Sequence, residues 1–170
     1  MKQINRIKVI AFIALLAFSS SCLKMPEESN IPTSQEESAL LKSYLGNLVS
    51  KGYNVDTTSM GVYYVVLDKG EGVKANPGDT LTVGYAGYYV NGYMFDSSTL
   101  TSEDGKWTFI LGNPPMIKGW EDGMKVMNKN AKVQIIVPSD LAYGSTGIGN
   151  IGPYQTLVFV VKMFDLKPKK

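Results

Sequence analysis

The stretch YMFDSS, residues 93–98, places a carboxylate between a phenylalanine and two hydroxyl side chains. Asp96 could be a general acid or base, and Ser97 or Ser98 could be a nucleophile activated by a neighbouring base. Two structural roles are also open for this aspartate: a turn cap, or a polar side chain that hydrogen-bonds inside an apolar pocket. Residue types elsewhere in the chain discriminate among these roles.

The composition removes several kinds of site. The 170 residues include no histidine and one cysteine, so Ser-His-Asp and Cys-His catalysis are excluded. Zinc sites built on histidine or on a thiolate cluster are excluded for the same reason. What remains for Asp96 is chemistry without a histidine base, or a hydrogen-bonding role.

One short motif invites a cofactor interpretation. GIGNIG, with Gly147, Gly149 and Gly152, fits the dinucleotide-binding spacing G-x-G-x-x-G. That motif needs a strand before it and a helix after it, whereas Pro153 and a β-rich run follow here. These glycines are better suited to a loop that bends over a groove, and we expect no cofactor and no metal.

The charge balance gives no support to nucleic-acid binding. Seventeen basic and fifteen acidic side chains give a formal charge of +2, but three basic ones lie in the first 21 residues. The remainder carries fourteen basic and fifteen acidic side chains, a net charge of −1. A near-neutral chain lacks the basic surface that a phosphate backbone requires, so we expect no nucleic-acid partner.

The N-terminus has the features of a targeting segment. MKQINRIK is basic, and the ten apolar residues VIAFIALLAF that follow are too few to span a bilayer comfortably. Small residues then lead to the sole cysteine, Cys22, in a pattern that resembles a bacterial lipoprotein signal, although Ser19 stands where such signals usually have an aliphatic residue. We expect residues 1–21 to be a signal peptide and Cys22 to be lipidated; a plain secretory signal or an uncleaved anchor is the alternative.

An amphipathic helix is predicted after a proline-containing tether, residues 22–33. Thr33 or Ser34 can cap it, with Glu36 or Glu37 three residues on, and Gly52 ends it. Its apolar face comprises Leu40, Leu41, Tyr44, Leu45, Leu48 and Val49. Residues 34–59, the helix and a linker, either pack on the main domain or form a homodimer contact.

From residue 60 the apolar pattern changes to period two. Strands are predicted within 60–70, 79–90, 106–111, 131–138 and 156–166, which are rich in Val, Tyr, Phe, Thr and Ile. Asn91-Gly92 indicates a type I′ hairpin turn, and the only stretch between strands that looks helical is 117–127. We therefore predict an antiparallel α+β domain over residues 60–168.

Five aromatic motifs occur in order along these strands: VGYAG, FDSS with its phenylalanine, MIKGWEDG, AYGSTG and TLVF. From about Val62 to Leu166 the chain resembles the FKBP-type peptidyl-prolyl cis/trans isomerases. The resemblance implies an antiparallel half-barrel sheet wrapped around one short helix, with an apolar pocket between them. It also implies an enzyme that accelerates rotation about Xaa-Pro bonds in proline-containing polypeptides, and a pocket that a macrolide inhibitor can fill.

The resemblance implies a role for each matching residue. Tyr85, Phe95, Trp107, Met116, Ile117, Trp120 and Phe159 would line the pocket, with Trp120 as its floor. The backbone N–H of Ile117 and the hydroxyl of Tyr143 would donate to substrate carbonyls. Asp96 would be held at the pocket wall by the hydroxyl of Tyr85, and Ile151 would belong to a loop above the site.

The chain departs from the family pattern after FDSS. Members often have an arginine a few residues on that pairs with the aspartate, whereas this chain has TLTSEDG. Asp96 therefore needs another partner, and Trp107 stands where phenylalanine is common. Two functions stay open: a lipid-anchored isomerase of the bacterial envelope that assists protein folding, or a proline-binding chaperone with little turnover.

Overall fold

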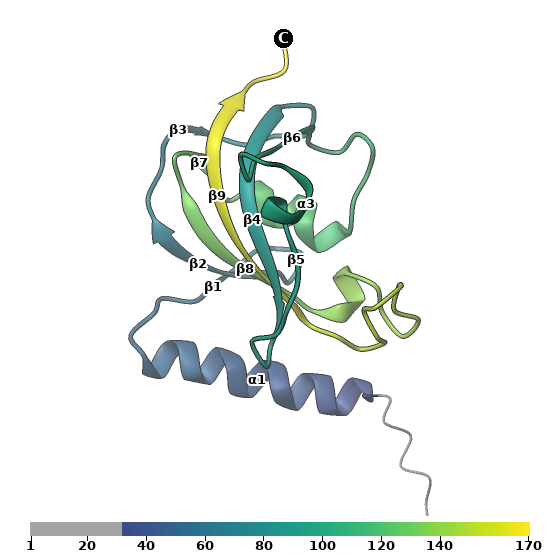
Figure 1. The fold of residues 1–170 in the computed structure, drawn as a ribbon. Helices are drawn as coiled ribbons and strands as arrows, with labels where there is room; N and C mark the ends of the chain where they lie inside the picture. The colour runs from purple at the N-terminus through teal and green to yellow at the C-terminus, as the bar shows by residue number, and fades with distance from the viewer. Residues whose placement is uncertain (1–31) are drawn as a thin grey trace, which may run out of the picture.

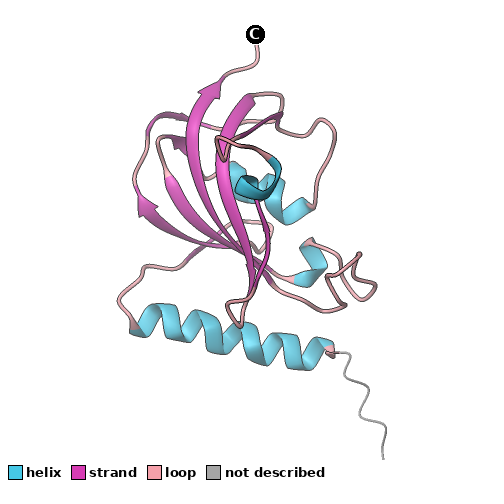
Figure 2. Ribbon diagram, viewed as in Figure 1, coloured by secondary structure: helices cyan, strands magenta, loops and turns pink. Residues whose placement is uncertain are grey.

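A curved antiparallel sheet wraps around one short helix in the computed structural model, which describes residues 32–170 (Figures 1 and 2). The predicted signal segment, Cys22 and most of the tether lie outside the described residues. The sheet order is β1-β2-β8-β9-β4-β5, and β6 also pairs with β4. The strands are β1 (Asp56–Thr57), β2 (Tyr63–Asp68), β4 (Thr80–Tyr89), β5 (Met94–Ser97), β6 (Trp107–Ile110), β8 (Lys132–Val137) and β9 (Leu157–Lys167).

This architecture confirms the predicted α+β fold. Each of the five predicted strand segments contains a strand, but β1, β5 and the separate pair β3 (Glu71–Lys74) and β7 (Asn128–Lys129) were missed. The two-residue strands β1 and β7 are too short to show a period of two, and β3 (EGVK) and β5 (MFDS) each contain one β-branched or aromatic residue. The expectation of a single helix between strands was wrong, because α3 (Lys118–Met124) is accompanied by α2 (Ser98–Thr101) and a 3₁₀ turn, η1 (Ser139–Leu141).

The hairpin between β4 and β5 is present, but its turn type differs from the prediction. Only Gly92 has a positive φ there, +90°, whereas a type I′ turn needs positive φ at both central residues. The Gly92 N–H donates to the Tyr89 carbonyl, and the Tyr89 N–H donates to the Tyr93 carbonyl. The connection is thus a type I turn followed by a glycine bulge, in which only the glycine leaves the usual backbone regions.

The two faces of the sheet have different partners. On β8, Val133, Ile135 and Val137 face the main core, whereas Ile136 faces a second cluster. The same alternation separates Phe159 on β9 from its neighbour Val158. The concave face therefore packs on α3, and the opposite face is free to receive another element.

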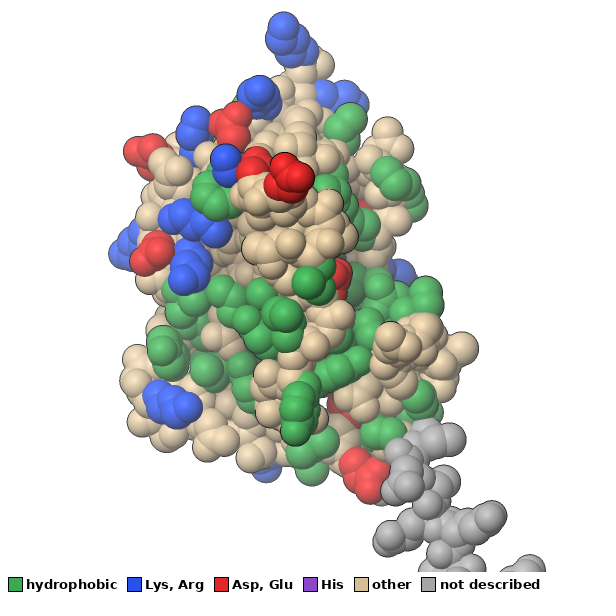
Figure 3. All heavy atoms as spheres, in the orientation of Figure 1, with side chains coloured by type: hydrophobic (Ala, Val, Ile, Leu, Met, Phe, Trp, Pro, Cys, Tyr) green, Lys and Arg blue, Asp and Glu red, His purple; other side chains and the backbone are tan. Residues whose placement is uncertain are grey.

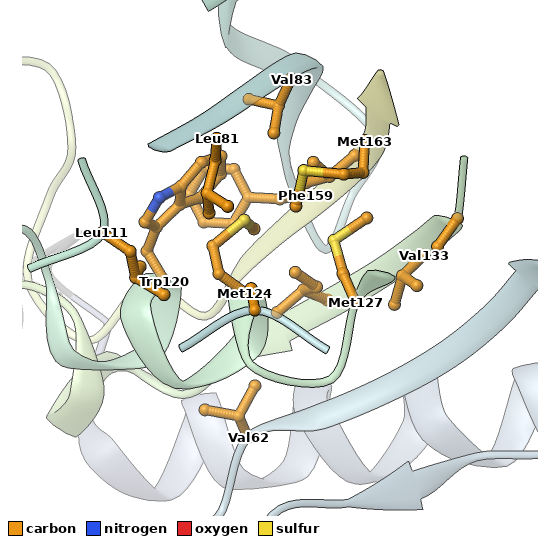
Figure 4. Close-up of a cluster of buried hydrophobic side chains, with 14 of the residues drawn as sticks. Val62, Leu81, Val83, Leu111, Trp120, Met124, Met127, Val133, Phe159 and Met163 are labelled. Atoms are coloured by element: carbon orange, nitrogen blue, oxygen red, sulfur yellow. The ribbon is translucent and has the colours of Figure 1, made fainter. Parts of the chain in front are cut away.

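Helix α3 lies unusually close to β8 because two glycines face the strand. A Cβ atom on Gly119 would lie 2.1 Å from Cγ1 of Val137, and one on Gly123 would lie 2.6 Å from Cγ2 of Ile135. This approach brings Trp120, Met124 and Met127 against side chains of β4, β8 and β9 (Figure 4). The main core is formed in this way between one short helix and the curved sheet.

Helix α1 (Ser34–Ser50) covers the opposite face at one end of the sheet (Figure 1). The predicted capping box is present, with Thr33 and Glu36 bonded to each other's backbone N–H groups. Leu48 is buried against Val65, Ile136 and Val158, which matches the interpretation of the helix as packed on the main domain. The buried face of the helix is narrower than the predicted apolar face, because Leu40 and Val49 are 53% and 60% exposed.

We predict opposite effects from two glycine-to-alanine substitutions. Gly119→Ala should lower the free energy of unfolding by about 1–3 kcal/mol, since the new methyl overlaps Val137. Gly46→Ala, in the interior of α1, should raise it by about 0.5–1 kcal/mol, since nothing lies within 4 Å of the added Cβ. Urea unfolding of the two variants measures both values. Equal effects would contradict the close approach of α3 to β8.

Candidate active site

A cavity of about 220 Å³ lies between the concave face of the sheet and α3. Tyr85 comes from β4, Asp96 from β5 and Trp107 from β6, while Trp120 lies on α3 and Phe159 on β9. Its lining comprises Tyr85, Asp96, Trp107, Met116, Ile117, Trp120, Tyr143 and Phe159. The structure thus brings together eight of the ten residues predicted for the site.

Trp120 is the most buried of the aromatic rings that line the cavity. It is 3% exposed, and its ring lies edge to face with Tyr85 at 5.4 Å and with Phe159 at 5.1 Å. Figure 4 shows it projecting from α3 toward Phe159 and Leu81. Edge-to-face packing on two sides holds the indole in one orientation, as the floor of an apolar pocket requires.

Trp107 forms another part of the wall, and it is supported there by the ring of Phe109, a residue that the sequence analysis did not predict. It stacks on Phe109 with a centroid distance of 4.3 Å and lies 5.8 Å from Tyr85. Phe109 also contacts Trp120 at 6.2 Å. The period of two from Trp107 could have placed Phe109 on the same face, since alternate residues of a strand share a side of the sheet.

Asp96 is held by two hydrogen bonds in place of the missing arginine. The Tyr85 hydroxyl donates to Oδ2 at 2.8 Å, as the family resemblance implied, and the Ser97 N–H donates to Oδ1 at 2.7 Å. The backbone bond to Ser97 was not anticipated, because it depends on the local turn of the chain. Each carboxylate oxygen therefore has a donor, so no cationic side chain is needed to hold the group.

This environment changes the acidity of Tyr85. Its pKa is raised well above the ordinary value, first by burial, then by donation of its proton to Asp96, and further by the charges of Asp96 and Tyr143. The phenol therefore stays protonated over the physiological range, and it remains a hydrogen-bond donor to Asp96.

The Ser97 and Ser98 hydroxyls bond to the backbone, and among residues 32–170 neither of them donates to a basic side chain. The Ser97 hydroxyl donates to the Tyr85 carbonyl at 3.1 Å. The Ser98 hydroxyl donates to the Gly105 carbonyl at 2.7 Å and accepts from the Tyr85 N–H at 3.0 Å. These bonds hold β4 beside β5 and tie the segment from Thr99 to Gly105 back to Ser98, which gives both serines a structural role.

Besides the buried indole N–H of Trp120, two donors at the cavity have no acceptor in the part of the chain that the structure describes. The Met116 N–H donates to Oε1 of Glu121 at 2.8 Å, and this bond fixes the segment before α3. The next amide, Ile117 N–H, and the Tyr143 hydroxyl make no such bond among residues 32–170. Both can donate to carbonyl oxygens of a bound peptide. Glu121 was not predicted, although it lies one helical turn after Ile117.

Phe95 and Ile151 lie beside the cavity and not on its lining. Phe95 packs edge to face on Phe159 at 5.7 Å and contacts Tyr89 at 5.1 Å, so it supports the wall from behind. Ile151 is half-buried against the main core in the loop between β8 and β9, where it pairs with Ile148. Their predicted direct contact with substrate stays a prediction.

Comparison with known proteins agrees with this geometry. Residues 71–164 match the model of the family described as FKBP-type peptidyl-prolyl cis-trans isomerase. The chain belongs to this family. It is 37% identical over 119 residues to the FKBP-type peptidyl-prolyl cis-trans isomerase FkpA of Escherichia coli K12, an alignment covering 70% of this chain and 43% of FkpA.

Other relatives agree with the membership in the FKBP family. The chain is 37% identical over 109 residues to the outer membrane protein MIP of Legionella longbeachae, covering 63% of this chain and 45% of MIP. The crystal structure of FkpA from Escherichia coli superimposes with a TM-score of 0.69 and 33% identity, covering 81% of this chain and 62% of that one. The chain spans less than half the length of these two curated relatives.

We predict that Tyr85→Phe changes how stability depends on pH. The folded-state pKa of Tyr85 lies above its unfolded value of about 10, so its contribution is complete below pH 10 and is lost above it. The free energy of unfolding of the wild type should fall more steeply above pH 10 than that of Tyr85→Phe. Denaturant unfolding of both chains between pH 8 and 11 gives the comparison; parallel curves would contradict the raised pKa.

Proposed function

We propose that the chain is a peptidyl-prolyl cis-trans isomerase. The observation that carries this proposal is the aromatic cavity floored by Trp120, with the Ile117 N–H and the Tyr143 hydroxyl as donors beside it. Its substrates are proline-containing polypeptides, bound with the prolyl ring on Trp120. A macrolide that fills the same cavity would compete with them.

An apolar pocket suits this reaction because of the electronic structure of the amide. Resonance puts negative charge on oxygen and positive charge on nitrogen, and it creates a barrier of about 18–20 kcal/mol. Rotation removes that charge separation, so the twisted amide is less polar than the planar one. A water-poor pocket therefore destabilises the planar form relative to the twisted form. A rate gain of 10⁴ would require about 5.5 kcal/mol.

Each residue has a role in this proposal. Trp120, Phe159 and Trp107 exclude water from the prolyl ring, and Tyr85 and Asp96 hold each other at the wall. The Ile117 N–H and the Tyr143 hydroxyl bind the carbonyl oxygens on either side of the reacting bond. No nucleophile or proton transfer is required, which agrees with the structural roles of Ser97 and Ser98.

The competing function is a binding module or chaperone that holds prolyl segments with little turnover. The decisive experiment is the cis-to-trans relaxation rate of an Xaa-Pro peptide with and without the full chain. We expect a clear acceleration at micromolar protein. Binding of the peptide without any acceleration would overturn the isomerase and support the binding module.

We predict that Trp120→Ala lowers kcat/KM more than Tyr143→Phe does. The first substitution empties the floor of the cavity, whereas the second removes one hydrogen bond, worth about 0.5–1.5 kcal/mol. The peptide relaxation assay measures both, with circular dichroism to verify folding; if Trp120→Ala does not fold, Trp120→Leu replaces it. The reverse order would show that hydrogen bonding outweighs exclusion of water.

For the whole chain, we propose residues 1–21 as a signal peptide, 22–33 as a tether from lipidated Cys22, 34–59 as helix and linker, and 60–168 as the isomerase domain. Support comes from the sequence pattern before Cys22 and from a relative named as an outer membrane protein. Among residues 32–170, no helix is long and apolar enough to cross a membrane. The proposed location is the bacterial envelope, where substrates would be folding envelope proteins.

We predict that Cys22→Ala releases the protein from membranes. The substitution removes the thiol to which the lipid would be attached. In the proposed arrangement the mature protein is held on the membrane by this lipid alone. Fractionation of cells expressing the wild type and Cys22→Ala measures the change, and Met25→Ala serves as a control that leaves the thiol. Equal membrane retention of the wild type and Cys22→Ala would contradict lipid anchoring.

A homodimer through α1 is the alternative to a monomer. The side chains that such a contact would use, Leu41, Tyr44, Leu45 and Leu48, already pack on the sheet, which favours the monomer. Exposed apolar side chains remain on the surface, and Figure 3 shows several gathered on the lower half of one face. In the β4–β5 hairpin, Tyr93 is 74% and Met94 is 50% exposed. The mass of the full chain in solution decides between the two forms.

A further inference from the structure

Helix α1 contains a buried carboxylate that the pocket itself does not use. Glu37 is 8% exposed, and no cationic side chain among residues 32–170 forms an ion pair with it. Its Oε1 accepts from the Ser139 N–H and from the Thr156 hydroxyl, each at 2.7 Å, and its Oε2 accepts from the Ser139 hydroxyl at 2.5 Å. Three donors thus stabilise this carboxylate, which also lies in the first turn of the helix, where the dipole favours negative charge.

The two residues that Glu37 binds are the two ends of one loop. Ser139 directly follows β8 and Pro138, and Thr156 directly precedes β9. Both are buried, at 1% and 2% exposure. The connection between them, residues 139–156 (the β8–β9 loop), carries Tyr143 and Ile151, so one side chain of α1 fixes both ends of the loop beside the cavity.

From Ser139 the hydrogen bonds continue to Tyr143. The Ser139 carbonyl accepts from the N–H of Ala142 at 2.8 Å and from the N–H of Gly144 at 2.9 Å. These are the residues on either side of Tyr143, so the backbone that carries its ring is tied to Ser139. Two further bonds, from the Gly147 N–H to the Tyr143 carbonyl and from the Tyr154 N–H to the Gly144 carbonyl, hold the loop to itself.

Beyond its base, the β8–β9 loop packs Ile151 on the main core and, among the described residues, receives one side-chain hydrogen bond from outside the loop. Residues 145, 146 and 148–150 are mostly exposed, and the Tyr89 hydroxyl reaches the Asn150 carbonyl at 3.0 Å. The hydrogen bonds of this loop are otherwise mainly internal, so bonds at its two ends contribute to its placement. Glu37 binds Ser139 at one end of the loop and Thr156 at the other.

We propose that Glu37 is a positioning residue, which places Tyr143 in the cavity by holding both ends of the β8–β9 loop. Helix α1 is then a functional part of the site and more than an N-terminal extension. The effect on catalysis rests on the proposed isomerase function, whereas the effect on the loop does not.

Three variants of the full chain test this role. Glu37→Ala leaves three buried donors without their acceptor and should lower kcat/KM about tenfold. Glu37→Gln should stay within about twofold of the wild type, because its oxygen can accept both Oε1 bonds and its amide can donate to the Ser139 hydroxyl. Leu48→Ala is the matched control: it weakens the packing of the same helix at its far end without touching the loop. Its kcat/KM should stay near that of the wild type.

Two further measurements separate positioning from a loss of stability. Amide hydrogen exchange in residues 142–156 should become faster in Glu37→Ala and not in Leu48→Ala. In the Tyr143→Phe background, the activity lost on adding Glu37→Ala should be smaller than in the wild type, because the two changes act on the same contact.

The inference is overturned if Glu37→Ala leaves loop exchange unchanged, if Glu37→Gln is as damaging as Glu37→Ala, or if Leu48→Ala lowers activity equally. A wild-type chain without isomerase activity would refute the proposed function alone. Hydrogen exchange in the β8–β9 loop would still decide whether Glu37 positions it.

Discussion

The packing of Trp120 against the concave face of the sheet is the contact on which the rest of the site depends. Gly119 and Gly123 lack the Cβ atoms that would collide with Val137 and Ile135, so α3 can lie directly on β8. At that separation the indole meets Tyr85 and Phe159 edge to face. The aromatic rings pack edge to face on one another, and they line the cavity that remains between the helix and the sheet.

The polar side chains around the cavity hydrogen-bond to one another or to the backbone, and none of them is arranged as a nucleophile or a general base. Tyr85 and Asp96 satisfy each other, Ser97 and Ser98 bond to the backbone, and Glu121 accepts from the Met116 amide. What the site offers a ligand is an apolar surface and two donors, the Ile117 N–H and the Tyr143 hydroxyl. This suits a reaction whose transition state is less polar than its ground state. It would suit hydrolysis or group transfer poorly.

Prediction from sequence worked best where local pattern and family motif coincide. Period-two runs located the long strands, and the capping residues located the start of α1. The wall and floor aromatics followed from motifs in a fixed order along the chain. It failed for the β4–β5 turn, where Asn91-Gly92 is compatible with more than one hairpin geometry. The short strands were also missed, since two to four residues form strands only when a neighbouring strand supplies the hydrogen bonds.

Glu37 illustrates the difference between what the sequence determines and what only the tertiary structure determines. The sequence by itself determined the long strands, the helices α1 and α3, the family, and most of the aromatics that meet at the cavity, because alternation and motif are properties of nearby residues. It marked Glu37 only as a helix-capping candidate. Only the tertiary structure decided that this carboxylate turns inward to Ser139 and Thr156, which lie 102 and 119 residues further along the chain. A hydrogen bond depends on distances and directions in space, and no local pattern in the chain encodes a meeting of segments so far apart.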